Sequence, residues 1–205
     1  MSVTSPIALF DYGAGNVPSV ERALQKLGAT TKRVTRPDQL AEARAIILPG
    51  VGHYAAIIRS LDEQNLRSPL LDSLARGIPF LGICLGLQAL YSSSEEASSL
   101  AGLNLFPGVI RSLPATVKLP HMGWNRLRIQ RLCPLLEGVT ESDYFYFAHT
   151  FAATGTSEEI VATCEYGASF ATVIHHENIF ATQFHPEKSG AAGARLLQNF
   201  VRLAE

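Results

Sequence analysis

The segment GICLGLQ, residues 82–88, places a cysteine between two glycines where an apolar run ends and a helical pattern begins. A cysteine that only fills a core needs no such frame, whereas a side chain held out at a sharp strand-to-helix turn does. Gly82 and Gly86 have no Cβ that would clash where the strand and the helix pack closely. The segment therefore predicts a nucleophile elbow with Cys84 as the nucleophile, and the alternative is a buried, inert cysteine.

The predicted elbow puts the thiol at a helix N-terminus, where the dipole and free N–H groups favour a thiolate and can stabilise an oxyanion. A thiolate nucleophile also needs a base, and QFHPEKS, residues 183–189, supplies His185 and Glu187. Residues i and i+2 of an extended chain project to the same face, so Glu187 can hold one ring nitrogen while the other faces the thiol. Pro186 favours that extended geometry. Alone this segment would more often be a surface His–Glu turn, but together with GICLG it predicts a triad.

On either side of GICLGLQ in the sequence, short apolar runs alternate with longer amphipathic runs. We expect strands at 7–10, 31–35, 45–48 and 79–83, with helices near 20–27, 53–64, 68–76 and 85–93. Such alternation predicts a parallel sheet with helices on both faces. The strand-like runs 126–129, 144–148, 160–164 and 170–174 predict an antiparallel section, before a strand at 178–184 and a final helix at 190–203. We expect one α/β domain, 1–205, of flavodoxin-like type with a mixed central sheet.

Bulk composition narrows the class of protein. The chain has 205 residues, 47% of them hydrophobic and 17% charged, which is typical of a packed core and not of a disordered chain. A net charge of −1 without a basic run argues against binding to nucleic acid or anionic membranes. The N-terminus lacks a basic signal region and no run is long enough for a membrane span, so we expect a cytoplasmic protein. Cys84, Cys133 and Cys164 form no CxxC pair, so neither a metal site nor a disulfide framework is predicted.

The remaining polar features are weaker signals. We expect His53, His175 and His176 to be solvated turn residues, and His149, in an apolar context, to be a hydrogen-bonded core histidine. The segment SSSEEASS, residues 92–99, is interpreted as a polar loop or a frayed helix end.

GICLGLQ together with QFHPEKS resembles the class I, triad-type glutamine amidotransferases, which release ammonia from glutamine through a cysteine thioester. PGVG, residues 49–52, follows a buried strand and resembles the oxyanion strand of that family. A longer ordered series resembles the glutaminase subunits of imidazole glycerol phosphate synthase, in histidine biosynthesis, over about residues 7–203. Besides the three segments already quoted, that series contains DYGAGN (11–16), PHMGWN (120–125) and YFYFAHTF (144–151). PHMGWN is the most discriminating of them.

The resemblance implies a role for particular residues. Cys84 would be the nucleophile, His185 the general base and acid, and Glu187 its orienter. Oxyanion contacts would come from the backbone of Gly50, Val51, Gly52 and Leu85, and glutamine recognition from Gln88, Glu96 and the backbone of Thr150 and Phe151. Gln88 lies four residues after Cys84 on the same helical face, which supports its place near the substrate, whereas Glu96 could equally be a solvated charge. The chain departs from the usual family pattern at His53, Tyr54, Leu87 and Phe151.

The resemblance also implies a partner. The synthase reaction, which makes imidazole glycerol phosphate and AICAR, is assigned to a (β/α)₈ barrel of roughly 250 residues, for which this chain has no room. We therefore expect a heterodimer with a separate synthase subunit, no metal and no organic cofactor. Exposed apolar residues on a loop commonly mark a partner surface, so the expected contacts are Pro120, Met122, Trp124 and Asn125; the alternative is that Trp124 folds back into its own core. The PGVG strand would hold an amide turned away from the oxyanion site until the partner docks.

Three rival functions remain at this point. The first is a glutaminase subunit of another pathway, such as pyridoxal phosphate synthesis, against which PHMGWN argues. The second is a non-catalytic scaffold, which would not need all three of Cys84, His185 and Glu187. The third is a cysteine peptidase or esterase, for which no peptide-binding groove is indicated.

Overall fold

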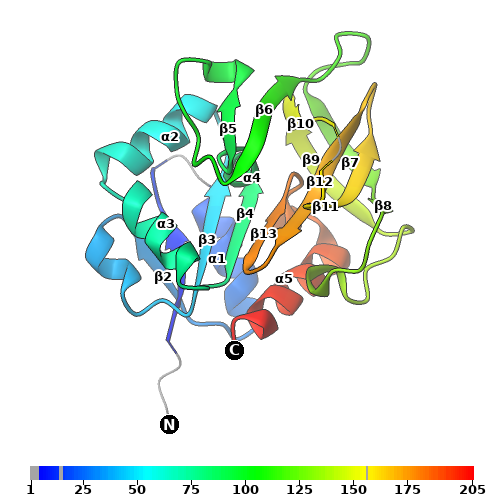
Figure 1. Ribbon diagram of the computed structural model, residues 1–205. Helices are drawn as coiled ribbons and strands as arrows, with labels where there is room; N and C mark the ends of the chain where they lie inside the picture. Colours follow the sequence, from blue (N-terminus) through cyan, green and yellow to red (C-terminus); the bar gives the residue numbers. More distant parts are fainter. Residues whose placement is uncertain (1–4, 14–15, 156) are drawn as a thin grey trace.

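The computed structural model describes residues 5–13, 16–155 and 157–205. Ala14 and Gly15, in the middle of DYGAGN, lie outside the described residues. Within the described part of the chain, the central sheet has eight strands in the order β2-β1-β3-β4-β13-β12-β11-β8 (Figure 1). Their bounds are β1 (Ile7–Phe10), β2 (Thr31–Val34), β3 (Ala45–Gly50), β4 (Phe80–Cys84), β8 (Arg128–Ile129), β11 (Ile160–Glu165), β12 (Ser169–His176) and β13 (Ile179–Thr182).

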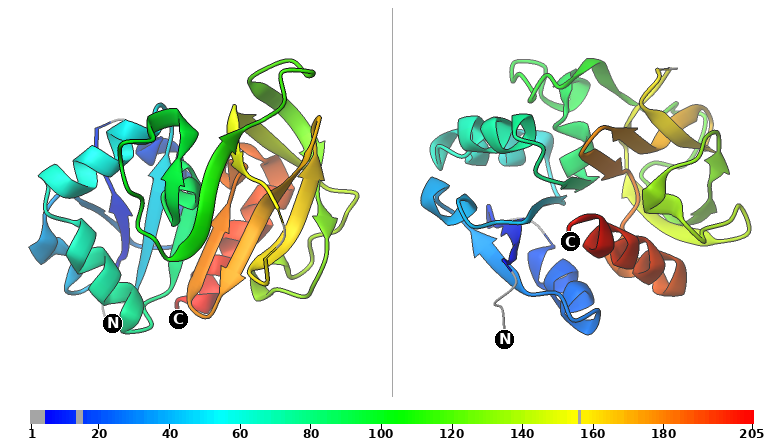
Figure 2. Two further views of the ribbon diagram at one scale, coloured as in Figure 1. Left: turned by 45° about the horizontal axis from the view of Figure 1, so that its top comes forward. Right: turned by 60° about the horizontal axis from the view of Figure 1, so that its bottom comes forward.

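The sheet is mixed, which confirms the predicted fold class. Strands β2, β1, β3, β4 and β13 run parallel, whereas β12, β11 and β8 are added in antiparallel order. Helices α1 (Val17–Lys26) and α5 (Gly190–Leu203) cover one face, and α2 (Tyr54–Glu63) and α3 (Arg67–Ala75) cover the other (Figure 2). Since both faces are covered, a strand such as β1 is apolar at every position: Ile7 and Leu9 enter one core, Ala8 and Phe10 the other.

Two smaller sheets stand beside the central one. The first contains β5 (Tyr91–Ser94), β6 (Phe106–Ser112) and β10 (Phe151–Ala153), in the order β10-β6-β5. The second is an antiparallel pair, β7 (His121–Arg126) and β9 (Tyr144–His149). Short helical turns complete the described chain: η1 (Pro37–Leu40), α4 (Leu85–Gln88), η2 (Glu95–Ala97), η3 (Pro134–Leu136) and η4 (Pro186–Lys188).

The structure corrects four local expectations. The helix predicted over 85–93 ends at Gln88, and Tyr91 instead begins a strand because its backbone pairs with Phe106. SSSEEASS is consequently divided between β5 and η2 and is not a frayed helix. The segment PHMGWN, expected as a loop, belongs to β7 from His121 onward, because these residues pair with β9. His175 and His176 lie in β12 and not in a turn.

None of the helices in the described ranges is both long enough and apolar enough to cross a membrane.

Candidate active site

Cys84 lies at the end of β4, where the backbone turns sharply into α4. Its φ of 54° is in the left-handed region, which non-glycine residues seldom occupy and which commonly marks a functional turn. A Cβ on Gly86 would collide with the carbonyl oxygen of Leu48, and one on Gly82 would lie 2.7 Å from the carbonyl oxygen of Gly86. The strand and the helix can therefore pack this closely only because both glycines frame the cysteine.

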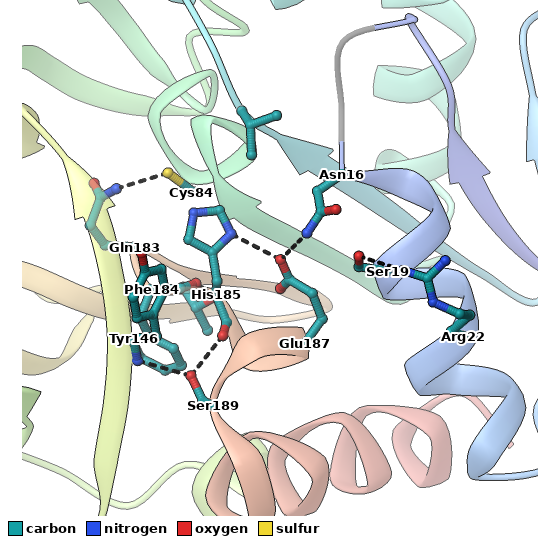
Figure 3. A network of polar contacts seen from close by, with 12 residues as sticks. Asn16, Ser19, Arg22, Cys84, Tyr146, Gln183, Phe184, His185, Glu187 and Ser189 are labelled. Carbon is teal, nitrogen blue, oxygen red and sulfur yellow. Dashed lines mark hydrogen bonds and ion pairs between the residues drawn. The ribbon is translucent and has the colours of Figure 1, made fainter. Parts of the chain in front are cut away.

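The imidazole of His185 lies between Cys84 and Glu187 (Figure 3). Its Nδ1 is 3.0 Å from Glu187 Oε1, and the two side chains are 2% and 0% exposed. The same carboxylate oxygen accepts a hydrogen bond of 2.9 Å from Asn16 Nδ2. Because Nδ1 is engaged by the carboxylate, Nε2 is the ring nitrogen left for the thiol.

This arrangement favours a charged imidazole. Burial alone would lower the pKa of His185, but the hydrogen bonds and charges of Cys84 and Glu187 outweigh it and raise that pKa to about 10. Burial opposes ionisation of Glu187, yet His185 and Asn16 hold the pKa of its carboxyl below the usual range. At neutral pH the imidazolium is therefore flanked by two groups that stabilise its positive charge.

A cavity of about 350 Å³ opens above the cysteine. It brings together most of the residues named from the sequence, including two of the four that were expected at the partner surface. The residues predicted from the sequence that line this cavity are Val51, Gly52, Cys84, Leu85, Gln88, Glu96, Pro120, Met122, Thr150, Phe151 and His185. Gly50, Glu187, Trp124 and Asn125 are not part of this lining, and Glu187 lies behind His185.

Gln88 is buried in the wall of the cavity. Its Nε2 donates to the carbonyl oxygen of Phe151 at 2.8 Å and to Gln183 Oε1 at 3.1 Å. Its Oε1 has no hydrogen-bond partner among the described residues. A buried acceptor without a partner is costly, so this oxygen is suited to a donor from a ligand.

Glu96 is half-buried and caps a helix. Its Oε2 accepts a hydrogen bond of 2.7 Å from the backbone N–H of Tyr54, at the start of α2. A carboxylate is favoured at a helix N-terminus by the dipole. Glu96 is therefore held at the cavity by this contact and is not a freely solvated charge, while His53, exposed, is the N-cap residue of the same helix.

The PGVG segment ends β3 directly beside the nucleophile, with Gly50 paired to Cys84 in the sheet. The backbone N–H of Val51 donates to the hydroxyl of Tyr12 at 3.2 Å. Burial raises the pKa of Tyr12, so this hydroxyl stays protonated and neutral. In this structure the N–H of Val51 is therefore hydrogen-bonded to the side chain of Tyr12.

Two buried histidines lie together at the cavity, where His149 is part of the lining and His121 is its neighbour. His149 Nδ1 is 2.9 Å from the carbonyl oxygen of Phe151, and its Nε2 is 3.1 Å from His121 Nδ1. Since a carbonyl oxygen only accepts, His149 donates through Nδ1 and accepts from His121 through Nε2. Burial lowers the pKa of His121 to about 4 and that of His149 to about 3, so both are neutral. His149 is thus the hydrogen-bonded core histidine that its apolar context indicated.

The expected partner residues divide between the two faces of β7. Met122 and Trp124 are 65% and 55% exposed, so Trp124 does not fold back into the core. Asn125 is half-buried on the opposite face, where its Nδ2 is 3.5 Å from His121 Nε2 and 3.4 Å from the carbonyl oxygen of Glu165. Exposed and half-buried side chains alternate because successive residues of a strand point to opposite faces. The expectation of a loop did not predict this alternation.

Sequence reasoning missed Tyr146 and Lys188, which line the cavity, and three further polar side chains that contact residues of the predicted site. Asn16 contacts Glu187, Tyr12 contacts Val51, and Gln183 Nε2 lies 3.5 Å from Cys84 Sγ. Asn16 and Tyr12 belong to DYGAGN and Gln183 begins QFHPEKS, so each was inside a quoted motif. Their side-chain contacts join residues 39 to 171 positions apart and have no local signal.

The other two cysteines lie away from this geometry. Cys133 and Cys164 are buried, and burial raises the pKa of both thiols, that of Cys164 to about 12. Within the described ranges, no group of three or more His, Cys, Asp or Glu residues could hold a metal ion.

Comparison with known proteins gives a consistent family and fold. The family model described as glutamine amidotransferase class-I matches residues 8–204. The imidazole glycerol phosphate synthase subunit HisH of Moorella thermoacetica is 45% identical over 199 residues, covering 97% of this chain and 95% of the relative. The protein of the same name from Methanothermobacter thermautotrophicus is 46% identical over 197 residues, covering 96% and 98%.

Two solved structures are similar in fold at low sequence identity. A crystal structure of a glutamine amidotransferase superposes with a TM-score of 0.77 at 19% identity, covering 97% of this chain and 98% of that chain. The structure of PurLQS from Thermotoga maritima gives a TM-score of 0.79 at 18% identity, covering 99% and 100%. At these identities the likeness shows the fold alone.

Proposed function

Because the chain belongs to the class-I glutamine amidotransferases, and within them to the HisH family of imidazole glycerol phosphate synthase subunits, we propose how its site hydrolyses glutamine. Cys84 is the nucleophile, His185 the acid and base, and Glu187 the group that orients His185. The observation that carries this assignment is the buried imidazole placed between the thiol and the carboxylate.

In the first half-reaction, the thiolate of Cys84 attacks the side-chain amide carbon of glutamine. A carbon–sulfur bond forms and the carbonyl oxygen becomes an oxyanion. The imidazolium of His185 then gives its Nε2 proton to the amide nitrogen, the carbon–nitrogen bond breaks, and ammonia leaves. The product is a glutamyl thioester on Cys84 beside a neutral imidazole.

In the second half-reaction, that neutral imidazole takes a proton from water as the water oxygen attacks the thioester carbon. The carbon–sulfur bond breaks, glutamate leaves, and the thiolate and the imidazolium are restored. Glu187 keeps the proton of Nδ1 on the side away from the thiol, so Nε2 remains the nitrogen that exchanges protons.

Glutamine binding is assigned to Gln88, Glu96 and the backbone of Thr150 and Phe151. The free Oε1 of Gln88 can accept a donor from the substrate, and the carboxylate of Glu96 suits its α-ammonium group. Both groups line the cavity that holds Cys84. These contacts would fix the amide carbon over the sulfur.

The oxyanion is assigned to backbone N–H groups of the Gly50–Gly52 segment and Leu85. The Val51 amide is engaged by Tyr12, so it would have to turn before it could serve an oxyanion. That N–H belongs to the peptide that joins Gly50 to Val51, and the glycine before it permits the large backbone rotation that a peptide flip needs. We infer that docking of the liganded partner favours the turned state.

The partner is proposed to be a separate (β/α)₈ synthase that forms a heterodimer with this chain and makes imidazole glycerol phosphate and AICAR. The 205 residues would form one glutaminase domain. Pro120 and Met122 line the cavity, and Met122 and Trp124 are exposed on the same strand. A partner seated on that strand would therefore cover the route by which ammonia leaves.

The test of this proposal is Cys84→Ala, assayed in the complex with the synthase subunit. Glutamine-dependent synthesis should be lost, because no thioester can form, while synthesis from added ammonium salt should continue. Cys164→Ala is the control and should retain glutaminase activity, since that buried thiol does not line the cavity and donates only to the backbone carbonyl of Glu165 among the described residues. Glutaminase activity in Cys84→Ala, or equal wild-type rates with and without the synthase, would contradict the assignment.

A further inference from the structure

Gln183 follows β13 and lies directly beside the nucleophile. Its side chain is fully buried, and its Nε2 is 3.5 Å from Cys84 Sγ, a normal distance for a hydrogen bond to sulfur. Figure 3 shows this amide on the side of Cys84 away from Glu187, with the imidazole of His185 next to the thiol. The sulfur therefore has a second polar neighbour besides His185.

The orientation of this amide is set by its neighbours. The carbonyl oxygen of Phe151 can only accept, so the group of Gln88 that faces it at 2.8 Å must be the NH₂. That NH₂ also faces Gln183 at 3.1 Å, so Gln183 must present its oxygen there. The NH₂ of Gln183 is then the group directed at Cys84. If the amide of Gln183 were reversed, its NH₂ would face the NH₂ of Gln88, and its oxygen would face the thiolate of Cys84.

We propose that Gln183 is a catalytic residue, whose side-chain N–H donates to Cys84 Sγ and stabilises the thiolate, with its orientation fixed through Gln88 by the carbonyl of Phe151. This rests on the proposed role of Cys84 in glutamine hydrolysis. The thiolate is both the attacking group and the group that leaves when water cleaves the thioester. The neutral sulfur of the thioester is a weak acceptor, whereas the thiolate is a strong one. The hydrogen bond from Gln183 is therefore stronger to the thiolate, and it favours the step in which water cleaves the thioester and the thiolate leaves.

The test uses Gln183→Met, which keeps the length and approximate volume of the side chain but has no donor. Alkylation of Cys84 by iodoacetamide is followed from pH 5 to 9 by mass spectrometry of the Cys84 peptide. A hydrogen bond to a charged group changes an equilibrium by about ten- to hundredfold. The alkylation rate at pH 7 should therefore fall by about tenfold or more, with the rate–pH curve displaced to higher pH, and kcat should fall more than KM rises.

The matched control is Thr172→Val. The backbone carbonyl of Thr172 accepts from the N–H of Gln183, but its buried hydroxyl has no partner among the described residues. This variant should alkylate and turn over glutamine as the wild type does. If Gln183→Met does not fold, Gln183→Asn replaces it: the shorter side chain withdraws the amide from the sulfur, so the same slow alkylation is expected.

Folded Gln183 variants that alkylate at the wild-type rate across the pH range would overturn the inference and leave the proposed function intact. Conversely, if the wild-type complex did not hydrolyse glutamine, the proposed function would fail. Alkylation needs no glutamine, so it would still decide whether Gln183 stabilises the thiolate.

Discussion

The two sides of the cavity are built in different ways. On the side of Cys84, the elements β3, β4 and α4 are packed on both faces, and glycines allow backbones to approach within contact distance. On the opposite side, the pair β7–β9 buries one face and exposes Met122, Trp124 and Tyr144 on the other. The nucleophile thus lies in a closely packed part of the molecule, whereas the strand assigned to the partner exposes one of its faces.

The largest expected effect is on the first side, at the triad. His185→Asn should reduce kcat for glutamine hydrolysis by about 10³- to 10⁴-fold, because the acid and base is removed. Glu187→Gln should cost less, because glutamine can still accept from Nδ1 but does not stabilise the imidazolium. Steady-state assays of both variants in the complex measure the difference. Equal losses would mean that the carboxylate does more than orient the ring.

A second prediction compares glycines from the two sides. Gly86→Ala should lower the free energy of unfolding by more than about 3 kcal/mol, because its Cβ would meet the backbone of Leu48. Gly123→Ala, on β7, meets no atom within 4 Å but has φ of 143°, and should cost about 1 kcal/mol. Urea unfolding followed by circular dichroism gives both values. Equal costs would remove the distinction between a packed side and an open one.

The smallest effect is expected on the open side. Trp124→Ala should leave the unfolding midpoint nearly unchanged, because half of its surface is already exposed, but should weaken binding of the synthase about tenfold or more. Isothermal titration with the purified synthase subunit measures this. Leu132→Ala, which removes a 97% exposed apolar residue elsewhere, is the control and should bind normally. If both variants bound as the wild type does, β7 would not be the docking strand.

Local sequence patterns were sufficient where an element's environment is uniform. Strands such as β3 are buried on both sides and show as apolar runs, and α1 ends near Gly28, whose φ is 80°. Patterns failed where pairing with a distant segment decides the structure. Tyr91 has a helical context but joins β6, and Gly123 indicates a turn yet lies within β7.

The same limit applies to the site. Cys84 and His185 could be named from the sequence because each sits in a short motif with a physical requirement of its own. Tyr12 and Gln183 could not, because a tyrosine or glutamine carries no such requirement until a fold places Val51 or Cys84 beside it. Cys84, His185 and Glu187 could therefore be predicted as a set of residue types, whereas the polar side chains around them could be predicted only as parts of motifs.

The two-sided character of β7 has a consequence for how this protein can evolve. Its outward side chains, Met122 and Trp124, are exposed, whereas His121 contacts the buried His149 and Asn125 contacts His121. Neighbouring positions of one short strand should therefore evolve under different constraints. Substitutions at the outward positions should covary with residues of another gene product, and those at the inward positions with residues of this chain, in an alternating pattern with a period of two.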